Sequence, residues 1–237
     1  TLNRTHTIVV QALASDGLLV TASFVIGVVP DVLTVANDSA EASEDATQPI
    51  TGNVVDNDPA NDNLGGPLTV TAVNGEASGL GQAISGDNGG TFTINADGSW
   101  QFDPNGEFER LDEGESQATS VTLTISNALG MTETSVLSVT VTGRADAPTT
   151  LALDAISFDV KQTPPIVGIL SGTDVDSDQS DLVFTLPQRA ENPHNELFDT
   201  AGNQLRVKNG VSLEVGTVYS LYIEVSDGTG SKGRTLE

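Results

Sequence analysis

The stretch 122–130 reads Thr-Leu-Thr-Ile-Ser-Asn-Ala-Leu-Gly, an alternating run of polar and apolar residues that ends in a glycine turn. The same pattern occurs once near each end of the chain, with Ser-Asp in place of Ser-Asn, and its Asp or Asn anchors lie 111 and 100 residues apart. The anchors are Asp16, Asn127 and Asp227. Because this period is the length of one β-sandwich, the sequence predicts a tandem array, an architecture more typical of spacers, adhesins and binding surfaces than of enzymes.

The period divides the chain into three units. Residues 1–31 read as one hairpin, and two strands bury no core alone, so we expect the C-terminal hairpin of a preceding, truncated domain. Residues 32–148 are predicted to form a complete sandwich and residues 149–237 a further one. Ten residues follow Asp227, fewer than the other units use, which leaves open whether unit three has its last strand.

The unpaired hairpin at the N-terminus allows two arrangements. It could dock on the open edge of unit three in a neighbouring molecule, since exposed sheet edges recruit strands, and this head-to-tail strand exchange could propagate. Alternatively the hairpin packs locally, while residues 231–237 close unit three poorly. The local arrangement is slightly favoured.

Segments rich in Thr and Val between glycine and aspartate clusters predict the strands. In unit two they are 32–36, 68–73, 90–95, 99–102, 120–126 and 132–142. In unit three they are 151–158, 167–170, 182–186, 204–207 and 218–225. The tetrapeptide Asn-Ala-Asp-Gly at 95–98 is a tight hairpin turn, because Asp-Gly supplies the positive φ that such turns need.

The chain is strongly acidic. Lys and Arg total 9 against 33 Asp and Glu, for a net charge of −24. Such a chain repels nucleic acid and anionic membrane surfaces, so neither is an expected partner. A cation is the expected ionic partner, and the alternative is that the acidity only keeps an exported protein soluble.

Cysteine is absent, which excludes disulfides, thiolate metal sites and a cysteine nucleophile. A small extracellular domain without disulfides needs another stabilising cross-link, and a bound metal ion would provide one. No apolar run approaches the ~20 residues that span a bilayer, so membrane insertion is not expected. No signal peptide stands at Thr1, which favours an excerpt from a longer protein.

Unit two resembles the VCBS repeat of bacterial surface proteins and RTX-type adhesins. The matching segments are 89–102, 111–116 and 139–143, together with the linker Asp-Ala-Pro at 146–148. Unit three is similar to bacterial cadherin-like domains in 172–178, 198–199, 202–205 and 226–228. These resemblances imply tandem Ig-like or cadherin-like Greek-key β-sandwiches in an all-β chain. They also imply a secreted or bacterial cell-surface protein for cell adhesion or biofilm formation, with calcium at the joints between domains.

Three alternating carboxylates in unit three have the spacing of a calcium loop. Asp174, Asp176 and Asp178 are within one short segment, and calcium takes ~6–8 oxygen ligands, mostly carboxylates and carbonyls. The loop is not an EF-hand, because Gln179 stands where glycine is needed and Thr185 where the bidentate glutamate should be. The alternative is a solvated acidic loop, although packed carboxylates without a cation raise one another's pKa.

The cadherin-like resemblance implies one metal site at the joint between units two and three. Its expected ligands are Glu44 or Asp45, Glu115, Asp146, Asp174, Asp176 and Asp227, with Asp178 nearby. A second, weaker site at the first joint would use Asp31 with Asp56, Asp58 and Asp62. There Asn127 replaces the anchor aspartate, which lowers the charge of that site.

Other candidate residues have plainer explanations. The acidic residues of 103–113 are expected to lie on one loop, which is either solvated or calcium-binding. They are not expected to form the two carboxylates facing each other across a cleft that a glycosidase needs. The two histidines, His6 and His194, lie in different units, and no Gly-x-Ser-x-Gly elbow accompanies them. Trp100 is expected in the core with Phe92 across the turn, the alternative being a sugar-stacking platform.

The sequence therefore predicts a non-enzymatic spacer or adhesion segment that calcium stiffens. The alternative is that a unit itself binds a cell-surface glycan or makes a homophilic protein contact. Trp100 and Tyr222 are the candidate aromatic residues for such binding.

Overall fold

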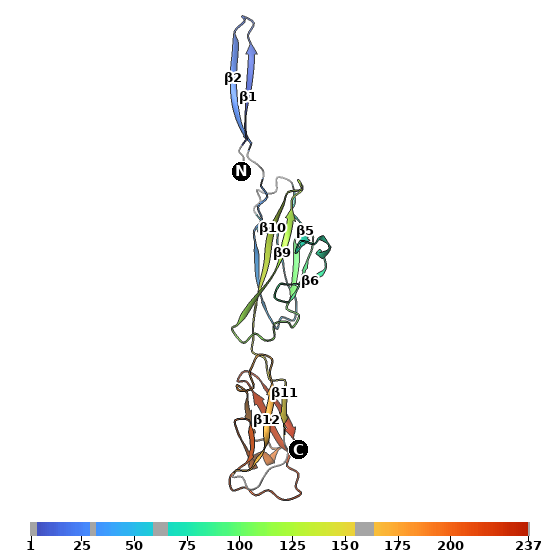
Figure 1. Ribbon diagram of the computed structural model, residues 1–237, viewed down its shortest axis with the longest axis vertical. Helices are drawn as coiled ribbons and strands as arrows, with labels where there is room; N and C mark the ends of the chain where they lie inside the picture. Colours follow the sequence, from blue (N-terminus) through green and yellow to red (C-terminus); the bar gives the residue numbers. More distant parts are fainter. Residues whose placement is uncertain (1–3, 29–31, 59–65, 155–163, 237) are drawn as a thin grey trace.

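The computed structural model describes residues 4–28, 32–58, 66–154 and 164–236. The regular structure in these ranges is β-strand apart from two short 3-10 helices, η2 (Ala77–Gly79) and η3 (Pro193–Leu197). Figure 1 shows a hairpin and two β-sandwiches that follow one another along the long axis. The described residues include no helix that is long and apolar enough to cross a membrane.

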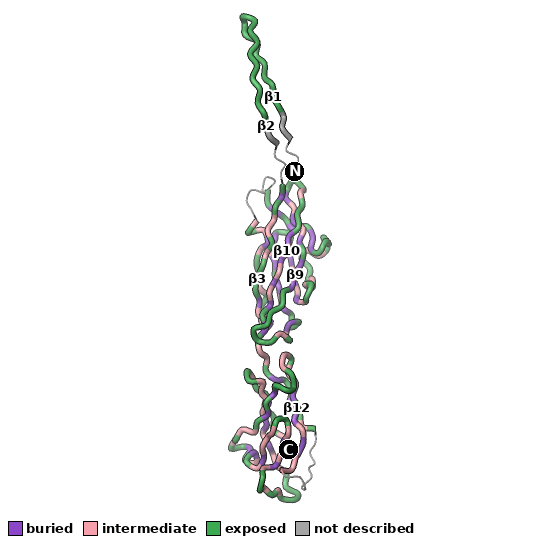
Figure 2. The backbone as a smooth tube through the Cα atoms, turned by 60° about the vertical axis from the view of Figure 1, so that its left-hand side comes forward, coloured by how far each residue is buried: buried purple, intermediate pink, exposed green. Residues whose placement is uncertain are grey.

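The N-terminal hairpin consists of β1 (Arg4–Leu13) and β2 (Leu19–Val28). The two strands pair antiparallel from Arg4↔Val28 to Leu13↔Leu19. Oδ1 of Asp16 accepts a hydrogen bond of 3.0 Å from the Leu18 N–H and so closes the turn. Every residue from 7 to 25 is exposed, as Figure 2 shows, so the predicted hairpin is present and its described side chains are uncovered.

Unit two is a sandwich of two four-stranded sheets. One sheet has the order β3-β10-β9-β5 and the other β4-β8-β7-β6. Their bounds are β3 (Asp38–Ser43), β4 (Ile50–Asn53), β5 (Thr69–Val73), β6 (Ala83–Ser85), β7 (Thr91–Ile94), β8 (Ser99–Asp103), β9 (Ser116–Ser126) and β10 (Thr132–Thr142). All pairings are antiparallel except that of β3 with β10, which is parallel.

The β7–β8 hairpin supplies much of the core of unit two. Its turn has the predicted form, with the Gly98 N–H donating to the Asn95 carbonyl at 3.0 Å and a φ of 87° at Gly98. Phe92 lies opposite Phe102 with ring centroids 4.7 Å apart. Trp100 is only 6% exposed, which confirms that it belongs to the core and is not a sugar-stacking platform.

Unit three is a smaller sandwich, with sheets of order β11-β12-β15-β14 and β13-β16-β17. The bounds are β11 (Thr150–Leu153), β12 (Ile166–Thr173), β13 (Val183–Thr185), β14 (Phe198–Ala201), β15 (Gln204–Val207), β16 (Leu221–Ser226) and β17 (Ser231–Leu236). Its core is separate from that of unit two. The last strand, which the sequence leaves open, is six residues long and pairs with β16 over its whole length.

The predicted first strand of unit two, 32–36, is wrong. The described backbone there is not part of a strand, and β3 begins only at Asp38. Leu33 is nevertheless buried and Val35 packs against the core. The alternation of apolar residues in this segment therefore reflects the burial of their side chains, although the backbone is not paired in a strand. The ladder to β10 starts beside Asn37, whose Oδ1 accepts the Val136 N–H at 2.9 Å.

Several short strands have no counterpart in the prediction. They are β4, β6 and β14, and none is longer than four residues. The predicted strand 151–158 corresponds to β11, which ends at Leu153, and 155–158 lies outside the described residues. Segments this short contain too few residues for a period-2 alternation to be recognised.

Candidate metal centre between units two and three

The linker 143–149 is held at both ends by backbone hydrogen bonds. The Gly143 N–H donates to the Glu115 carbonyl at 2.9 Å in unit two, and the Thr149 N–H donates to the Thr173 carbonyl at 2.8 Å in unit three. Ala147 lies against the β16–β17 turn, because a Cβ placed on Gly230 would come within 2.5 Å of the Ala147 Cβ. The linker therefore runs between the acidic loops of the two units at a fixed place.

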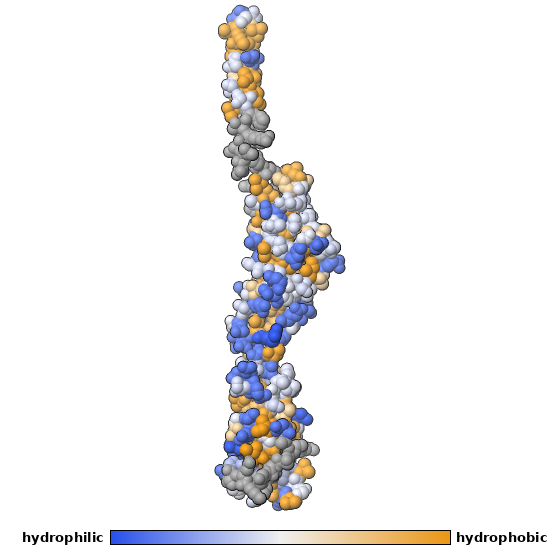
Figure 3. Space-filling model, in the orientation of Figure 1, coloured by the Kyte–Doolittle hydropathy of each residue, from blue (hydrophilic) through white to orange (hydrophobic). Residues whose placement is uncertain are grey.

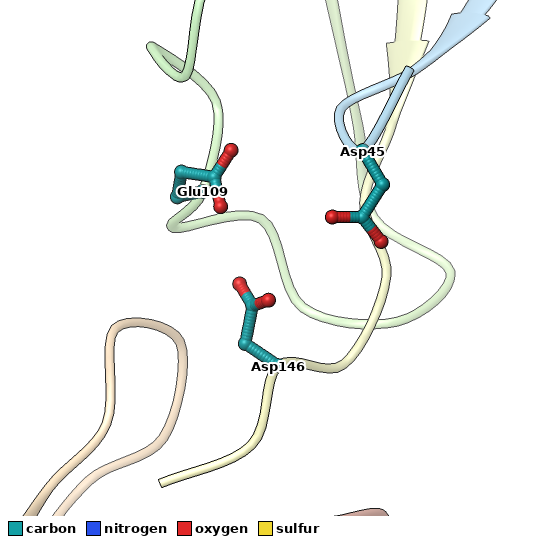
Figure 4. Close-up of side chains that lie close together, drawn as sticks. All are labelled: Asp45, Glu109 and Asp146. Atoms are coloured by element: carbon teal, nitrogen blue, oxygen red, sulfur yellow. The ribbon is translucent and has the colours of Figure 1, made fainter. Parts of the chain in front are cut away.

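Three carboxylates from three segments of the chain converge beside the linker. Asp45 follows β3, Glu109 lies on the loop between β8 and β9, and Asp146 belongs to the linker itself. One carboxylate oxygen from each residue lies within 4.8 Å of the others. Figure 4 shows the three side chains turned toward a common space, and Figure 3 shows hydrophilic surface around this joint.

Glu44 is a buried carboxylate beside this group. It is only 3% exposed, and its Oε1 accepts the backbone N–H of Arg144. Its Oε2 is buried without a hydrogen-bond partner in the described part of the chain. Burial raises the pKa of Glu44; the Arg144 N–H opposes the rise, whereas the charges of Asp146, Glu109 and Asp45 add to it. A buried carboxylate with an unsatisfied oxygen is costly unless a cation balances it.

Unit three contributes two carboxylates from the loop after β12. Oδ2 of Asp176 accepts the Asp146 N–H at 3.0 Å, which ties this loop to the linker. Burial, together with the neighbouring Asp176, raises the pKa of Asp174 to about 6. Buried oxygens without a hydrogen-bond partner among the described residues occur on all three of these aspartates.

The carboxylates of units two and three interact electrostatically at the linker. Burial raises the pKa of Asp146, and the charges of Asp45, Asp176 and Asp227 raise it further. Burial likewise raises the pKa of Glu109, with added contributions from Asp146 and Asp45. Mutual repulsion of this kind is what a bound cation would relieve.

Asp227 differs from the other carboxylates because its own turn satisfies it. Its Oδ1 accepts the N–H groups of Thr229 and Gly230, each at 2.7 Å, and its Oδ2 accepts the Thr229 hydroxyl at 2.8 Å. Burial raises the pKa of Asp227, but these hydrogen bonds outweigh burial and leave the pKa lowered. Asp227 therefore adds a negative charge at the edge of the joint. Both of its carboxylate oxygens already accept hydrogen bonds from its own turn.

The donor set fits a hard divalent cation. The seven carboxylates gathered at the joint offer only oxygen atoms, which calcium prefers, and neither histidine nor cysteine stands among them. They are Glu44, Asp45, Glu109, Asp146, Asp174, Asp176 and Asp227. Among the ion pairs of the described residues, only that of Arg144 Nε with Asp45 Oδ2, at 3.8 Å, involves this group.

Two predicted ligands, Glu115 and Asp178, are not among the seven carboxylates of this group. Glu115 is exposed, and its Oε2 accepts the Asp112 N–H of its own loop at 3.4 Å. Asp178 is exposed, and its carbonyl accepts the Asp181 N–H in a local turn. The prediction missed Glu109, which it treated as part of an acidic run. The sequence does contain a signal for the position of Glu109, because the preceding residue is the apolar Phe108. Phe108 is buried and so fixes the loop at that point.

At the first joint the described carboxylates are sparser. Oδ1 of Asp58 accepts the Ala36 N–H at 2.7 Å. Burial and the charge of Asp58 raise the pKa of Asp38 to about 6, although a hydrogen bond with the Asn57 side chain opposes the rise. Asp56 is exposed, whereas Asp31 and Asp62 lie outside the described residues. Asp38 was not predicted to take part in this site.

Asn127 occupies the anchor position of unit two and is committed to its turn. Its Oδ1 accepts the N–H groups of Leu129 and Met131, each at 3.1 Å. Asp16 and Asp227 also accept an N–H two residues further on. The repeated anchor is therefore a turn-closing residue in all three units, whatever its part in a metal site.

The aromatic candidates for glycan binding do not form an open platform in the described structure. Trp100 is in the core, and the Arg189 guanidinium lies 3.7 Å above the centre of the Tyr222 ring. His194 accepts the Ser220 N–H through Nδ1 at 3.0 Å and lies edge-on to Tyr219. These contacts assign the three side chains to the packing of their own units.

Two sandwiches joined through a linker among facing carboxylates have the architecture of tandem cadherin domains. Residues 30–143 match the family model described as the bacterial cadherin-like domain. The match falls on unit two, whereas the resemblances in sequence implied a cadherin-like domain in unit three and a VCBS-like one in unit two. No curated protein sequence matches the chain at a significant level.

The chain is similar in fold to cadherin ectodomains. The protocadherin GammaB4 extracellular domain has a TM-score of 0.56 at 16% identity over 98% of this chain and 36% of that chain. Protocadherin Gamma B2 extracellular cadherin domains 1–5 have a TM-score of 0.56 at 13% identity over 100% of this chain and 51% of theirs. Protocadherin Gamma B7 extracellular cadherin domains 1–4 have a TM-score of 0.56 at 16% identity over 98% of this chain and 56% of theirs. This chain thus spans little more than half of these chains at most, and the likeness establishes the cadherin-like sandwich fold.

Proposed function

We propose that the chain is an extracellular spacer or adhesion segment in which calcium stiffens the joint between units two and three. One observation carries the proposal. Glu44 has a buried, unsatisfied oxygen beside the converging carboxylates of Asp45, Glu109 and Asp146. Asp176 of unit three is bonded to the Asp146 backbone, so an ion held here would contact both units.

The mechanism is electrostatic. Without an ion, the carboxylates on the two sides of the linker repel one another, and the joint gains freedom to bend. Glu44, Asp45 and Glu109 of unit two, Asp146 of the linker, and Asp174 and Asp176 of unit three would hold a calcium ion, whose positive charge would offset their repulsion. Asp227 adds negative charge at the rim. The two sandwiches then move as one body.

The proposed setting is the outside of a bacterial cell. Calcium sites in extracellular modules have dissociation constants of ~10⁻⁴–10⁻³ M, which suits calcium levels outside cells and not inside them. The bacterial cadherin-like match in unit two and the resemblance to VCBS repeats support a surface or secreted protein of the RTX-adhesin type. The net charge of −24 is compatible with a cation partner.

Calorimetric titration of chelator-stripped protein with calcium tests the proposal, with the melting temperature followed in parallel. We expect saturable binding that raises the melting temperature. Asp146→Asn should abolish or strongly weaken this binding, whereas the matched variant Asp178→Asn should not, because Asp178 is exposed and outside the cluster. No binding by the unsubstituted chain at calcium well above ~10⁻³ M would contradict the proposal.

We also infer that the β1–β2 hairpin closes a further cadherin-like sandwich. Between residues 8 and 24, one of its faces consists of apolar residues, namely Ile8, Val10, Ala12, Val20, Ala22 and Phe24. In unit two, the equivalent face of β9 and β10 is buried against the opposing sheet, with β3 and β5 at its sides. A hairpin about 33 Å long could bury only a few hundred Å² against another hairpin, less than a stable interface needs.

Hydrogen exchange tests this assignment. In residues 1–237 alone, the amides of β1 and β2 should exchange almost as fast as in an unfolded chain, because a lone hairpin is marginally stable in water. In the longer parent polypeptide they should be protected as strongly as those of β9 and β10. Equal, weak protection in both would exclude the assignment.

A further inference from the structure

Arg144 is the basic residue that enters the acidic cluster. Its position is fixed by its backbone, since its N–H donates to Oε1 of Glu44 and the preceding Gly143 N–H donates to the Glu115 carbonyl. A Cβ on Gly143 would collide with the carbonyl oxygens of Leu111 and Asp112, so the chain can approach this loop only with glycine there. Arg144, two residues before Asp146, is thereby placed beside Glu44 and Asp45.

The side chain of Arg144 is bound less firmly than its backbone. Its Nε lies 3.8 Å from Oδ2 of Asp45, and the two side chains are 67% and 52% exposed. An ion pair this open is weak and can be broken without burying an unpaired charge. Asp45 is also one of the three residues whose carboxylate oxygens lie within 4.8 Å of one another. The Asp45 carboxylate therefore belongs both to this ion pair and to the group of converging carboxylates.

We propose that Arg144 is a tethered cation that competes with calcium for Asp45. This rests on the proposed calcium site. When no ion is bound, the guanidinium offsets part of the repulsion among Asp45, Glu109 and Asp146. When calcium binds, Asp45 turns to the ion, and the guanidinium moves into water, which its exposed position permits. Arg144 thus lowers the calcium affinity of the joint. It also reduces the repulsion between the carboxylates of the joint when no ion is bound.

Replacing Arg144 by Gln removes the positive charge and retains the backbone N–H that Glu44 accepts. We expect Arg144→Gln to bind calcium about two- to fivefold more tightly, the range that the strength of exposed ion pairs allows. The gain should shrink as salt is added, because screening weakens both the ion pair and the repulsion that it offsets.

Arg110→Gln is the matched control. Arg110 follows Glu109 directly and its loss changes the net charge by the same amount, but its guanidinium forms no ion pair with the described residues. Calorimetric titration of the three proteins at low and moderate salt separates the outcomes. Tighter binding in Arg144→Gln than in Arg110→Gln supports the proposal. Equal affinities in the two variants, or weaker binding in Arg144→Gln, would overturn it and leave the calcium site standing. An unsubstituted chain that binds no calcium would overturn both proposals.

Discussion

The backbone N–H of Asp146 donates a hydrogen bond of 3.0 Å to Oδ2 of Asp176, so the linker is bonded to unit three at the same residue that offers its carboxylate to unit two. This one residue therefore couples two separate cores. It also means that Asp176 has two roles, one as an acceptor for the linker and one as a charge at the joint. The two roles can be separated by substitution.

Asp176→Asn keeps an oxygen acceptor and loses a charge, whereas Asp176→Ala loses both. We expect both variants to bind calcium about tenfold more weakly or worse, because site affinity follows the number of ligand charges. In chelator, small-angle scattering should show Asp176→Asn as extended as the unsubstituted chain and Asp176→Ala more bent on average. Identical scattering of the two variants would mean that the hydrogen bond does not orient the joint.

Glu44→Gln should affect the ion-free and ion-bound states in opposite directions. A buried amide costs less than a buried carboxylate, so the melting temperature in chelator should stay the same or rise. With calcium present, the increase in melting temperature should be largely lost, since the ion has lost a buried charged ligand. Glu115→Gln is the control, because Glu115 is exposed and bonds only within its loop. A lower melting temperature in chelator for Glu44→Gln would contradict this reading of Glu44.

The pH dependence of the ion-free protein follows from raised pKa values. Folding raises the pKa of Glu44, Glu109 and Asp146, and raises that of Asp174 to about 6. The folded state therefore binds more protons than the unfolded state between about pH 4 and pH 6, and stability falls as the pH rises through this window. The lowered pKa of Asp227 acts in the opposite sense, but only at lower pH, around and below its ordinary value.

In chelator we therefore expect the melting temperature to rise as the pH is lowered from 7 to 5. Calcium affinity should fall over the same range, because protons compete with the ion for these carboxylates. Parallel thermal melts and calcium titrations at several pH values measure both effects. A melting temperature in chelator that falls steadily from pH 7 to 5 would contradict the predicted direction.

Val10→Asp in the N-terminal hairpin should leave units two and three unaffected. Val10 is exposed, so the melting transitions of the two sandwiches should change by no more than about 0.5 kcal/mol. Leu123→Asp, on the buried face of β9, should destabilise unit two by about 3 kcal/mol or more. A loss of stability in Val10→Asp would show that the hairpin packs on one of the sandwiches in solution.

The long alternating strands could be predicted from the sequence because many residues share one pattern. The predicted strands 90–95, 99–102 and 132–142 and the predicted core position of Trp100 are confirmed for this reason. Residues 32–36 show the limit of the method. Their alternation reflects burial of Leu33 and Val35, while the hydrogen-bonded strand starts later, at Asp38.

The candidate site was only partly predictable for a different reason. Asp146, Asp174 and Asp176 stand out because they lie in a short linker and a short alternating loop. Glu109 and Asp38 lie in segments where acidic residues are frequent, and only the folded chain distinguishes a facing carboxylate from a solvated one. The reverse case is Glu115, which the family resemblance suggested as a ligand, and Asp178, which the spacing suggested. Both are exposed and bonded within their own loops.

The parallel pairing of β3 with β10 has a mechanical consequence. The chain enters unit two at the N-terminal end of β3 and leaves it at the C-terminal end of β10, and these strands are paired side by side from Asp38↔Leu137 to Ser43↔Thr142. A pulling force applied through the two neighbouring units therefore acts along the strands in opposite directions. It loads the hydrogen bonds of this ladder in shear, all at once, and does not peel them apart one by one. Unit two is thus built to transmit tension along the array, with the strength of the β3–β10 ladder setting the force at which it opens.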